Sequence, residues 1–427
     1  MNIEINNKST FKSSTLENIN QNLNIDLIKV KKSKSFKNVF LITLLFCVIV
    51  SLTSFGIIFG LSKHSMASII ASDTLNINTS PFLSTIPLTP KITYIPSPLN
   101  GELIQSDKFN LLQQNKVLAV MIENLGGLSG ARPQAGLQDA DIVYETEAEG
   151  DITRFMAIYW NNDASTTESS QSIKLEPIRS ARKYFLDWLL EYKDPLYMHI
   201  GQADSTNSNT DALGALSKYG IKDLADIPGS FNRDHNCEKI KAIEHCAYSD
   251  TQTLLKLAQD KGWVNNINST SSVTTISPFL YKEDKAIDIN ATTSNMANKV
   301  NINFEQDAAT YGVNWNYDIT NNTYLRSDSL NKPFLDQISK KQIYTKTLII
   351  EKTSIVVDND IKYHKIIKTL GSDDAWIVQD GKVTLATWKK DSLTSRTHYY
   401  NKITNQELAI DRGKIWVTVT SKLPTFL

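Results

Sequence analysis

The hydrophobic and polar positions between residues 97 and 265 follow two alternating patterns. Four short apolar runs, each bounded by polar or turn residues, predict strands at residues 117–122, 141–144, 154–159 and 196–200. Apolar residues at helical spacing predict a helix over 181–192, and a second helix is expected over 250–261 with Ser249 as its N-cap. Residues 97–265 are therefore predicted to form a mixed α/β domain.

The pattern changes in the second half of the chain. Short segments rich in β-branched or aromatic residues predict strands at 347–351, 355–357, 363–369, 375–379, 382–388 and 414–420. The Asp380-Gly381 dipeptide between two of them is typical of a hairpin turn. Residues 301–427 are expected to form a smaller, mostly β domain, joined to the first by a Ser/Thr/Asn-rich linker over 266–300. The predicted fold class is α+β, preceded by one transmembrane helix.

The longest apolar run, residues 39–61, carries no charge. At 1.5 Å per residue it extends about 34 Å, enough to cross a hydrocarbon core of about 30 Å with some tilt. Lysines are concentrated just before the run, at positions 29, 31, 32, 34 and 37. This asymmetry predicts a single-pass signal anchor, with the N-terminus in the cytoplasm and the later domains outside the cell membrane. A cleaved signal peptide is the alternative, because small residues follow at 65–67.

The segments on either side of this run have compositions that do not favour a core. Residues 1–38 are rich in Asn, Ser and Lys without apolar periodicity, which predicts a disordered cytoplasmic tail. Residues 62–96 are rich in Ser, Thr and Pro, which is typical of a stalk that lifts the folded part off the membrane.

The overall charge limits the classes of partner that the protein is expected to bind. Lys plus Arg and Asp plus Glu number 45 each, so the formal net charge is zero. Proteins that bind nucleic acid usually carry a basic excess, and no nucleic-acid partner is expected here. The membrane, a cell-wall ligand or another envelope protein remain as the expected partners.

Several short motifs follow one another in an order that resembles the DUF3048 family. In the first half they are PLNG at 98–101, VMIEN at 120–124, ARPQAGL at 131–137, ADIVYE at 140–145, EGDITRF at 149–155 and IRSAR at 178–182. In the second half they are WNY at 315–317, YLR at 324–326, DGK at 380–382 and TWK at 387–389. The resemblance implies an N-terminal and a C-terminal domain, and the family's name states that its function is unassigned.

The sequence also departs from that family pattern. Glu176 stands where the family tends to have Gly before Pro, Asp151 stands where a second Gly is usual, and Phe334 stands where a His typically follows Pro. At residues 244–246 only His245 is kept from a Pro-His-Asn segment.

Charged residues lie inside or directly beside the apolar runs of the first domain. Glu145, Glu147 and Glu149 alternate, so on an extended strand they would share one face. An ionised side chain in such a place is costly unless it is paired or lies at a cleft. Internal ion pairs are one interpretation, and a pocket for an anionic or zwitterionic ligand, such as a peptidoglycan fragment, is the other. The candidate ligand-binding residues are Glu123, Arg132, Glu145, Glu149, Arg154, Arg179, Arg182 and His199.

Arg179 and Arg182 give the pocket hypothesis its main support. They are three residues apart at the predicted start of a helix, with Ser180 as the expected cap, so both could hold one carboxylate or phosphate. The rival expectation is that they pair internally with Glu145 or Glu149.

Acid–base catalysis is the alternative to a binding function. The candidate residues are Glu145, Glu149, His199 and His245. The sequence has no Gly-x-Ser-x-Gly elbow, His-Glu-x-x-His helix or phosphate-binding glycine loop. We therefore expect a non-enzymatic envelope module, with an envelope hydrolase or transferase directed at peptidoglycan as the alternative, and no cofactor.

Two of the three cysteines lie close together in the sequence. Cys237 and Cys246 are accompanied by His235 and His245, so a disulfide, free thiols and a zinc site are three alternatives. An exported segment favours oxidation, and we expect the disulfide rather than a metal.

Overall fold

The computed structural model describes residues 92–112, 116–127, 130–160, 172–264, 276–286, 295–304, 308–359 and 362–427. Residues Leu88–Leu427 form one compact unit. The predicted cytoplasmic tail and membrane-spanning run, together with residues 62–91 of the predicted stalk, lie outside the described residues. Within the described ranges, no helix has the length and apolar character needed to cross a membrane.

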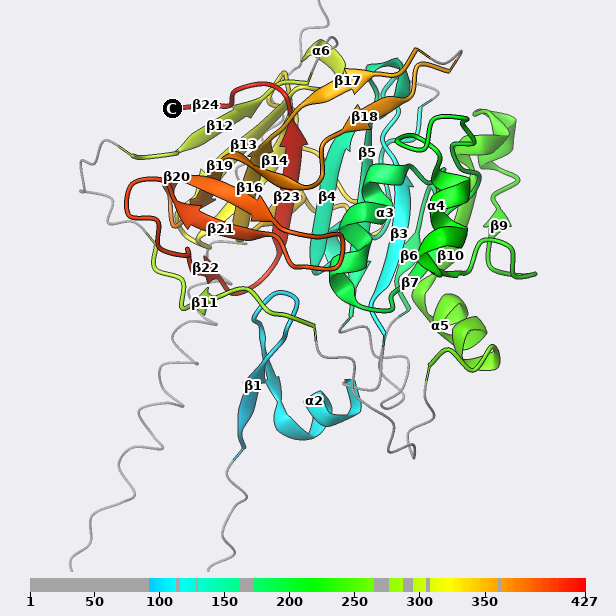
Figure 1. Ribbon diagram of the computed structural model, residues 1–427, viewed down its shortest axis with the longest axis horizontal. Coiled ribbons are helices and arrows are strands. Elements are labelled where there is room, and N and C mark those ends of the chain that lie inside the picture. The colour runs from blue at the N-terminus through cyan, green and yellow to red at the C-terminus, as the bar shows by residue number, and fades with distance from the viewer. Residues whose placement is uncertain are drawn as a thin grey trace, which may run out of the picture. The chain divides into compact units, whose positions relative to one another are not determined.

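A sheet of ten strands runs through the whole unit (Figure 1). Its strands follow the order β21-β20-β19-β16-β23-β4-β5-β3-β7-β8. From the first half of the chain come β3 (Leu118–Glu123), β4 (Ile142–Glu147), β5 (Thr153–Tyr159), β7 (Leu196–Met198) and β8 (Lys222–Asp223). From the second half come β16 (Thr347–Lys352), β19 (Gly371–Gln379), β20 (Lys382–Lys390), β21 (His398–Asn401) and β23 (Ile415–Thr420).

Strand β23 joins the two halves of the chain within this sheet. It lies between β16 and β4 and is parallel to both, with Ile415 opposite Ile142 and Thr418 opposite Glu145. The expected α/β domain and the expected β domain therefore contribute to one continuous sheet. The predicted two-domain arrangement is not confirmed, because hydrogen bonds and core packing cross the proposed boundary. The fold is sheet-rich with few helices.

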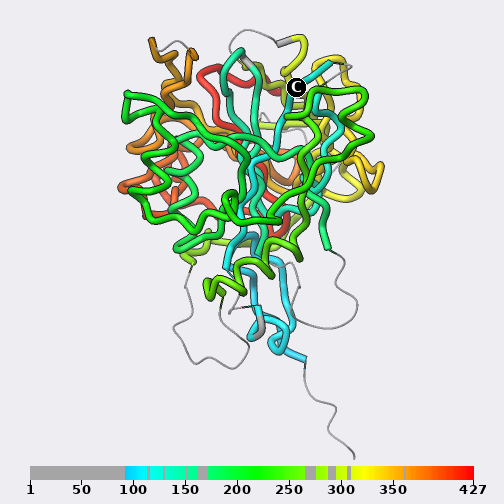
Figure 2. The backbone as a smooth tube through the Cα atoms, turned by 90° about the vertical axis from the view of Figure 1, so that its right-hand side faces the viewer, coloured from blue at the N-terminus to red at the C-terminus, as the bar shows by residue number. Residues whose placement is uncertain are grey.

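Each face of the central sheet is covered by a different layer (Figure 2). Ala119 and Met121 of β3 point to one face, where they join a core that includes residues of α3 (Lys183–Leu189) and α4 (Ala212–Tyr219). Val120 and Ile122 point to the other face, as the period of two in a strand requires. The near-continuous apolar runs in the sequence reflect burial on both faces.

The second face is covered by a smaller antiparallel sheet. Its order is β15-β14-β13-β12-β24. Its strands are β12 (Lys299–Ile302), β13 (Val313–Asp318), β14 (Thr323–Asp328), β15 (Tyr344–Thr345) and β24 (Thr425–Phe426). Trp315 of β13 packs against Trp416 of β23, with ring centroids 5.2 Å apart in an edge-on arrangement. This contact fixes the small sheet on the large one.

The remaining elements are short. They are the strands β1 (Tyr94–Pro96), β2 (Leu103–Gln105), β6 (Lys174–Leu175), β9 (Asn232–Arg233), β10 (Ala247–Asp250), β11 (Tyr281–Lys282), β17 (Ile355–Val357), β18 (Lys365–Ile367) and β22 (Ile410–Asp411), and the helices α2 (Ser106–Leu112), α5 (Thr251–Asp260) and α6 (Ala308–Tyr311). Strand β1 pairs with β2, so the last residues of the predicted stalk belong to the folded unit.

Local sequence signals predicted the positions of the helices and strands well. They predicted the residues at which the helices begin less well. The predicted turn at Asp380-Gly381 is present, with both residues at positive φ between β19 and β20. The cap predictions were wrong. Asp250, not Ser249, accepts the backbone N–H of Thr253 at the start of α5, and Arg182 rather than Ser180 occupies the N-cap of α3.

Candidate functional site

Charged residues gather where the parallel strands of the central sheet end. Glu123 is the last residue of β3, Glu147 is the last residue of β4, and His199 directly follows β7. The carboxyl ends of parallel strands meet at one edge of a sheet, which is the usual place for a ligand site in open α/β sheets. Some of the sequence-predicted residues are thus brought to one edge of the sheet, and the predicted residues as a whole form separate clusters.

Glu123 is the centre of the first cluster. Its side chain is 3% exposed, and its carboxylate contacts two bases from distant parts of the chain. One oxygen lies 2.8 Å from Nδ1 of His245, and the other lies 3.2 Å from Nε of Arg179. A buried carboxylate needs such partners to stay ionised. Three residues that the sequence suggested separately therefore form one group.

The loop that carries His245 is held by several bonds. The structure has a disulfide between Cys237 and Cys246, with Cα atoms 5.6 Å apart, as expected for an exported segment. The backbone N–H of Asp234 donates to the carbonyl of Cys246, which anchors the other end of the loop. Because His245 directly precedes Cys246, the disulfide also limits where its imidazole can lie.

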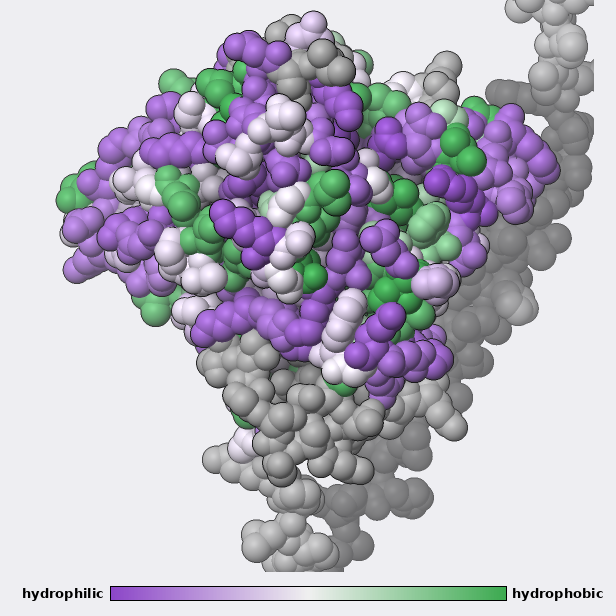
Figure 3. Space-filling model, turned by 45° about the vertical axis from the view of Figure 1, so that its right-hand side comes forward, coloured by the Kyte–Doolittle hydropathy of each residue, from purple (hydrophilic) through white to green (hydrophobic). Residues whose placement is uncertain are grey.

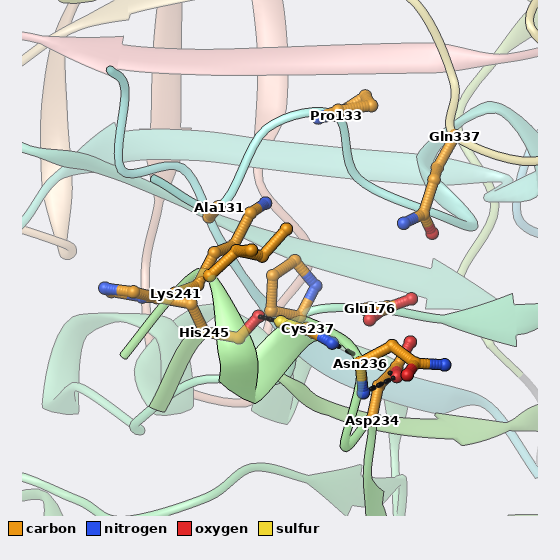
Figure 4. A pocket seen from close by; sticks show the side chains of 11 residues that line it. Ala131, Pro133, Glu176, Asp234, Asn236, Cys237, Lys241, His245 and Gln337 are labelled. Atoms are coloured by element: carbon orange, nitrogen blue, oxygen red, sulfur yellow. Dashed lines mark hydrogen bonds between the residues drawn. The ribbon is translucent and has the colours of Figure 1, made fainter. Parts of the chain in front are cut away.

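A cavity of about 240 Å³ opens beside His245 (Figure 4). Its wall combines acidic, basic, amide and apolar side chains, namely Glu176, Asp234, Lys241, His245, Asn236, Gln337, Ala131, Pro133, Pro177 and Ile240, together with Cys237 of the disulfide. Figure 4 shows His245, Glu176, Asp234 and Asn236 arranged around one side of the space and Gln337 and Pro133 on the other. The cavity therefore presents both signs of charge within a small volume.

The acidic side of this cavity is formed by Asp234 and Glu176, and donors from the protein contact both carboxylates. Backbone N–H groups of Asn236 and Cys237 donate to Asp234 and lower the pKa of that carboxyl. Glu176 is buried and pairs with Lys174 at 2.5 Å. Gln337 comes from the loop before β15, so the second half of the chain closes the wall.

Glu145 lies elsewhere, in a closed ion pair. Its side chain is 0% exposed, and both oxygens accept from the guanidinium of Arg326 at 2.9 Å. The indole N–H of Trp416 and the hydroxyl of Thr153 also donate to it. Its carboxylate is therefore fully occupied by protein groups, and Glu145 is not among the residues that line the cavity.

Arg132 extends this buried network. Its Nε donates to the side-chain oxygen of Asn124 at 2.8 Å, and Asn124 in turn contacts Thr153. The guanidinium packs over the rings of Tyr311 and Phe334. Burial, followed by the charge of Arg326, lowers the pKa of Arg132. These contacts hold Arg132 against Tyr311 of α6 and against Phe334.

Glu149, Arg154 and Arg182 form a third cluster. The guanidinium of Arg182 donates hydrogen bonds to both carboxylate oxygens of Glu149, and the guanidinium of Arg154 lies 4.0 Å from the same carboxylate. Although burial opposes ionisation, the bonds with Arg182 lower the pKa of Glu149. Burial, together with the charge of Arg182, lowers the pKa of Arg154 to about 10. The structure thus pairs Arg182 internally, as the rival expectation held, and separates it from Arg179.

His199 is held by a further set of bonds. Its Nδ1 lies 2.8 Å from the carbonyl of Gly201, and its Nε2 lies 3.0 Å from the carboxylate of Asp223. Both ring nitrogens are therefore engaged, and the imidazole is buried. His199 does not touch Glu123 or line the cavity.

Several cavity residues carried no signal in the sequence. Asp234, Lys241 and Gln337 lie in loops and belong to no motif, and they meet His245 only in the folded chain. Arg326 stood in the motif YLR but was not recognised as the partner of Glu145, which is 181 positions away. In the part of the chain that the structure describes, no three His, Cys, Asp or Glu side chains are placed to hold a metal ion.

The face of the protein drawn in Figure 3 is mostly hydrophilic, and its hydrophobic residues form small separate patches between charged and polar ones. Ile240 and Ile243 of the disulfide loop are among the exposed apolar side chains of the molecule. Because Ile240 also lines the cavity, exposed apolar and charged side chains lie next to each other at its wall.

Comparison with known proteins matches both halves of the chain. Residues 103–264 match the family described as "Protein of unknown function (DUF3048) N-terminal domain", and residues 300–417 match its C-terminal domain. A protein of Bacillus subtilis (strain 168), named "Putative lipoprotein YerB", is 26% identical over 277 residues, covering 65% of this chain and 74% of that relative. The crystal structure of YerB protein from Bacillus subtilis matches with a TM-score of 0.60 at 23% identity, covering 78% of this chain and 99% of that one. The last likeness shows a shared fold.

Proposed function

This chain belongs to the DUF3048 family, whose function is unassigned, and we propose that it is an envelope protein that binds part of a zwitterionic ligand in the cavity beside His245. The envelope location draws support from the relative named as a lipoprotein and from the uncharged run at residues 39–61. In this proposal the run is a single-pass anchor, with the N-terminus in the cytoplasm and the folded unit outside.

One observation carries the binding proposal. Glu123 engages Nδ1 of His245, which leaves Nε2 of the imidazole available to a ligand in the cavity. A histidine fixed in this way presents a hydrogen-bonding group with a defined orientation, which is what a binding site needs. Arg179 also contacts the carboxylate of Glu123 and balances its negative charge, and the side chain of Arg179 is 27% exposed.

The charges around the cavity indicate the kind of ligand. Asp234 and Glu176 would attract an ammonium group, whereas Lys241 would attract a carboxylate. A ligand with both groups, such as a peptidoglycan stem peptide with its terminal carboxylate and the free ammonium of its diamino acid, matches this distribution. The volume is small for a ligand pocket, so the cavity would hold one end of a larger molecule.

Acid–base catalysis at the same place is the second candidate. A carboxylate that orients a histidine is the arrangement by which a general base is held and stabilised. Among the described residues that line the cavity there is no Ser, Thr or free thiol, so water would be the nucleophile in a hydrolysis. The candidate base is then His245, with Glu123 in the positioning role.

The test is incubation of the full-length chain with a synthetic muramyl pentapeptide, followed by mass spectrometry of the solution and the protein. We expect retention of the intact peptide, and we expect His245→Asn and Glu123→Gln to weaken retention by about tenfold or more, the range for one lost charge-assisted hydrogen bond. Cleaved peptide in solution, absent with His245→Asn, would favour the hydrolase.

A matched control is His235→Asn. His235 lies two residues before Cys237, but its side chain is 87% exposed and does not line the cavity. This variant should retain the peptide like the unchanged protein. Equal retention by the His245 and His235 variants, or no retention by the unchanged protein, would contradict the binding proposal.

A further inference from the structure

The hairpin formed by β1 and β2 is a two-stranded sheet of its own. Its opposed residues are the pairs Tyr94 and Gln105, Ile95 and Ile104, and Pro96 and Leu103. Figure 1 and Figure 2 both show this hairpin (blue) at the lower end of the folded unit, whereas β17 and β18 (orange) lie at the upper end. The hairpin also follows residues 62–91, through which the chain reaches the uncharged run at 39–61.

One face of this hairpin is buried. Ile104 is 5% exposed and belongs to the core that also contains Leu99 and Leu112 of α2. Its neighbour Leu103 points to the opposite face, because successive side chains alternate along a strand. A strand that is covered on one face carries polar residues on the face that meets water. The hairpin departs from this pattern on the face of Leu103.

The other face of the hairpin is apolar and exposed. The backbone N–H of Ser106 donates to the carbonyl of Thr93, so the pairing continues before β1 and the alternation extends to the preceding residue. Ile92, Tyr94 and Leu103 are 61%, 53% and 51% exposed. None of the residues on this face carries a charge, and we call them the hairpin face, namely Ile92, Tyr94, Pro96, Leu103 and Gln105.

The length of the preceding chain indicates what covers the hairpin face. Residues 62–91 separate it from the proposed anchor, and a chain of about 30 residues spans at most about 100 Å. The anchor would therefore keep a lipid surface near the hairpin at all times. A partner tethered in this way binds at a high effective concentration, even where each contact is weak.

The chemistry of the hairpin face suits a lipid surface. Binding to the boundary between headgroups and acyl chains increases with the apolar area that is buried there. Tyrosine is enriched at this boundary, because its ring is apolar while its hydroxyl stays in contact with water. Glu102, beside Leu103, is exposed and acidic, so anionic lipids would not strengthen the contact.

We propose that the hairpin face docks on the outer surface of the membrane in which the chain is anchored. This inference rests on the single-pass anchor of the proposed function. Docking turns the β1–β2 end of the folded unit toward the lipid and the β17–β18 end away from it. The contact depends on apolar burial, so it forms on a zwitterionic membrane.

The test places a fluorescent label on the hairpin face of the full-length chain in phosphatidylcholine vesicles. Gln105→Cys leaves every apolar residue of the face in place. In a Cys47→Ser background the label attaches there alone, because Cys237 and Cys246 are bonded to each other. We expect lipids brominated in their acyl chains to quench the emission. Val356 of β17 is 50% exposed, and the same label at Val356→Cys should not be quenched.

A second substitution tests whether the apolar side chains cause the contact. Tyr94→Ser, added to the chain labelled at position 105, should lower the ratio of quenched to unquenched label by about tenfold, the factor for one large side chain that is no longer buried. Tyr363→Ser is the matched control, because Tyr363 is 68% exposed and lies between β17 and β18. It should leave the quenching unchanged. The thermal midpoint of each variant shows whether the fold is kept.

The possible failures can be told apart. A chain that floats with the vesicles while its label at position 105 is not quenched would overturn the docking and leave the anchor intact. A chain that does not float with them would refute the anchor and the docking together. Equal quenching after Tyr94→Ser would also overturn the proposal. An emission shift without quenching, increasing with the ratio of protein to lipid, would assign the hairpin face to a second copy of the chain.

Discussion

At the scale of the residue, the central feature is that buried charges are matched across long distances in the chain. The three alternating glutamates illustrate this, since Glu145 pairs with Arg326, Glu147 with Lys365, and Glu149 with Arg182. The sequence predicted that these carboxylates would need partners or a cleft. Removing one member of a buried pair costs about 3–5 kcal/mol, whereas the intact pair adds little, so these contacts specify the arrangement of the strands.

Glu351 provides a prediction about pH. Burial raises the pKa of its carboxyl from the ordinary value of 4.5 to about 7, while Tyr399 donates a hydrogen bond to it at 2.7 Å. A raised pKa means that the neutral form is preferred in the folded state. The stability linked to Glu351 is complete below about pH 4.5 and is lost as the pH rises through about 7.

We therefore expect the thermal midpoint to fall by a few degrees between pH 5 and pH 8, from a loss on the order of 2 kcal/mol. Glu351→Gln, which stays neutral, should show a smaller fall. Burial also raises the pKa of Asp411 to about 7, so part of the fall of the thermal midpoint with pH should remain in this variant. Differential scanning calorimetry across this range measures the effect, with Glu283→Gln as an exposed control. An identical slope in the Glu351 variant would contradict the prediction.

At the scale of the element, the loop between Cys237 and Cys246 positions His245. It contains two short 3-10 turns, Cys237–Lys239 and Ile243–His245, which have few apolar contacts of their own. The side chain of Arg233 donates to the carbonyl of Ile243 at 2.6 Å. A loop of this kind depends on its covalent closure, because its own packing provides little stability.

We expect the double variant Cys237→Ser, Cys246→Ser to lose roughly 2–3 kcal/mol of unfolding free energy, the chain-entropy value for a loop of about ten residues. Urea unfolding measures the loss, and reduction of the unchanged protein should reproduce it. Cys47→Ser is the control, since Cys47 lies outside the described residues. Two alkylatable thiols at 237 and 246 before reduction, or one bound zinc per chain, would count against the disulfide.

At the scale of the whole molecule, the ten-stranded sheet makes the two family domains one folding unit. Strand β23 supplies the neighbour that β4 would otherwise lack, and Trp416 on β23 contacts both Phe155 of β5 and Trp315 of β13. The first half of the chain alone would expose this apolar edge to water. An exposed central strand of this kind is prone to aggregate.

We therefore expect residues 97–265, expressed alone, to show no cooperative thermal unfolding. Coexpression with residues 266–427 should restore a soluble complex that copurifies and unfolds in one transition, because β23 then pairs with β4. Circular dichroism and affinity copurification measure the two outcomes. A cooperative transition from the first fragment alone would show that the predicted domain boundary is sufficient for folding.

The sequence by itself determined the local elements and the kinds of residue that matter. Apolar runs, turn signals and motif order indicated most of the principal strands, the Asp380-Gly381 hairpin and the charged positions, because period, turn chemistry and charge are properties of neighbouring residues. The tertiary structure decided which strands pair and which charges meet. Glu123 reaches His245 across 122 positions, and Asp234, Lys241 and Gln337 join them only around the folded cavity. No local pattern encodes such contacts, because they form only when the fold brings together strands and loops from different parts of the chain.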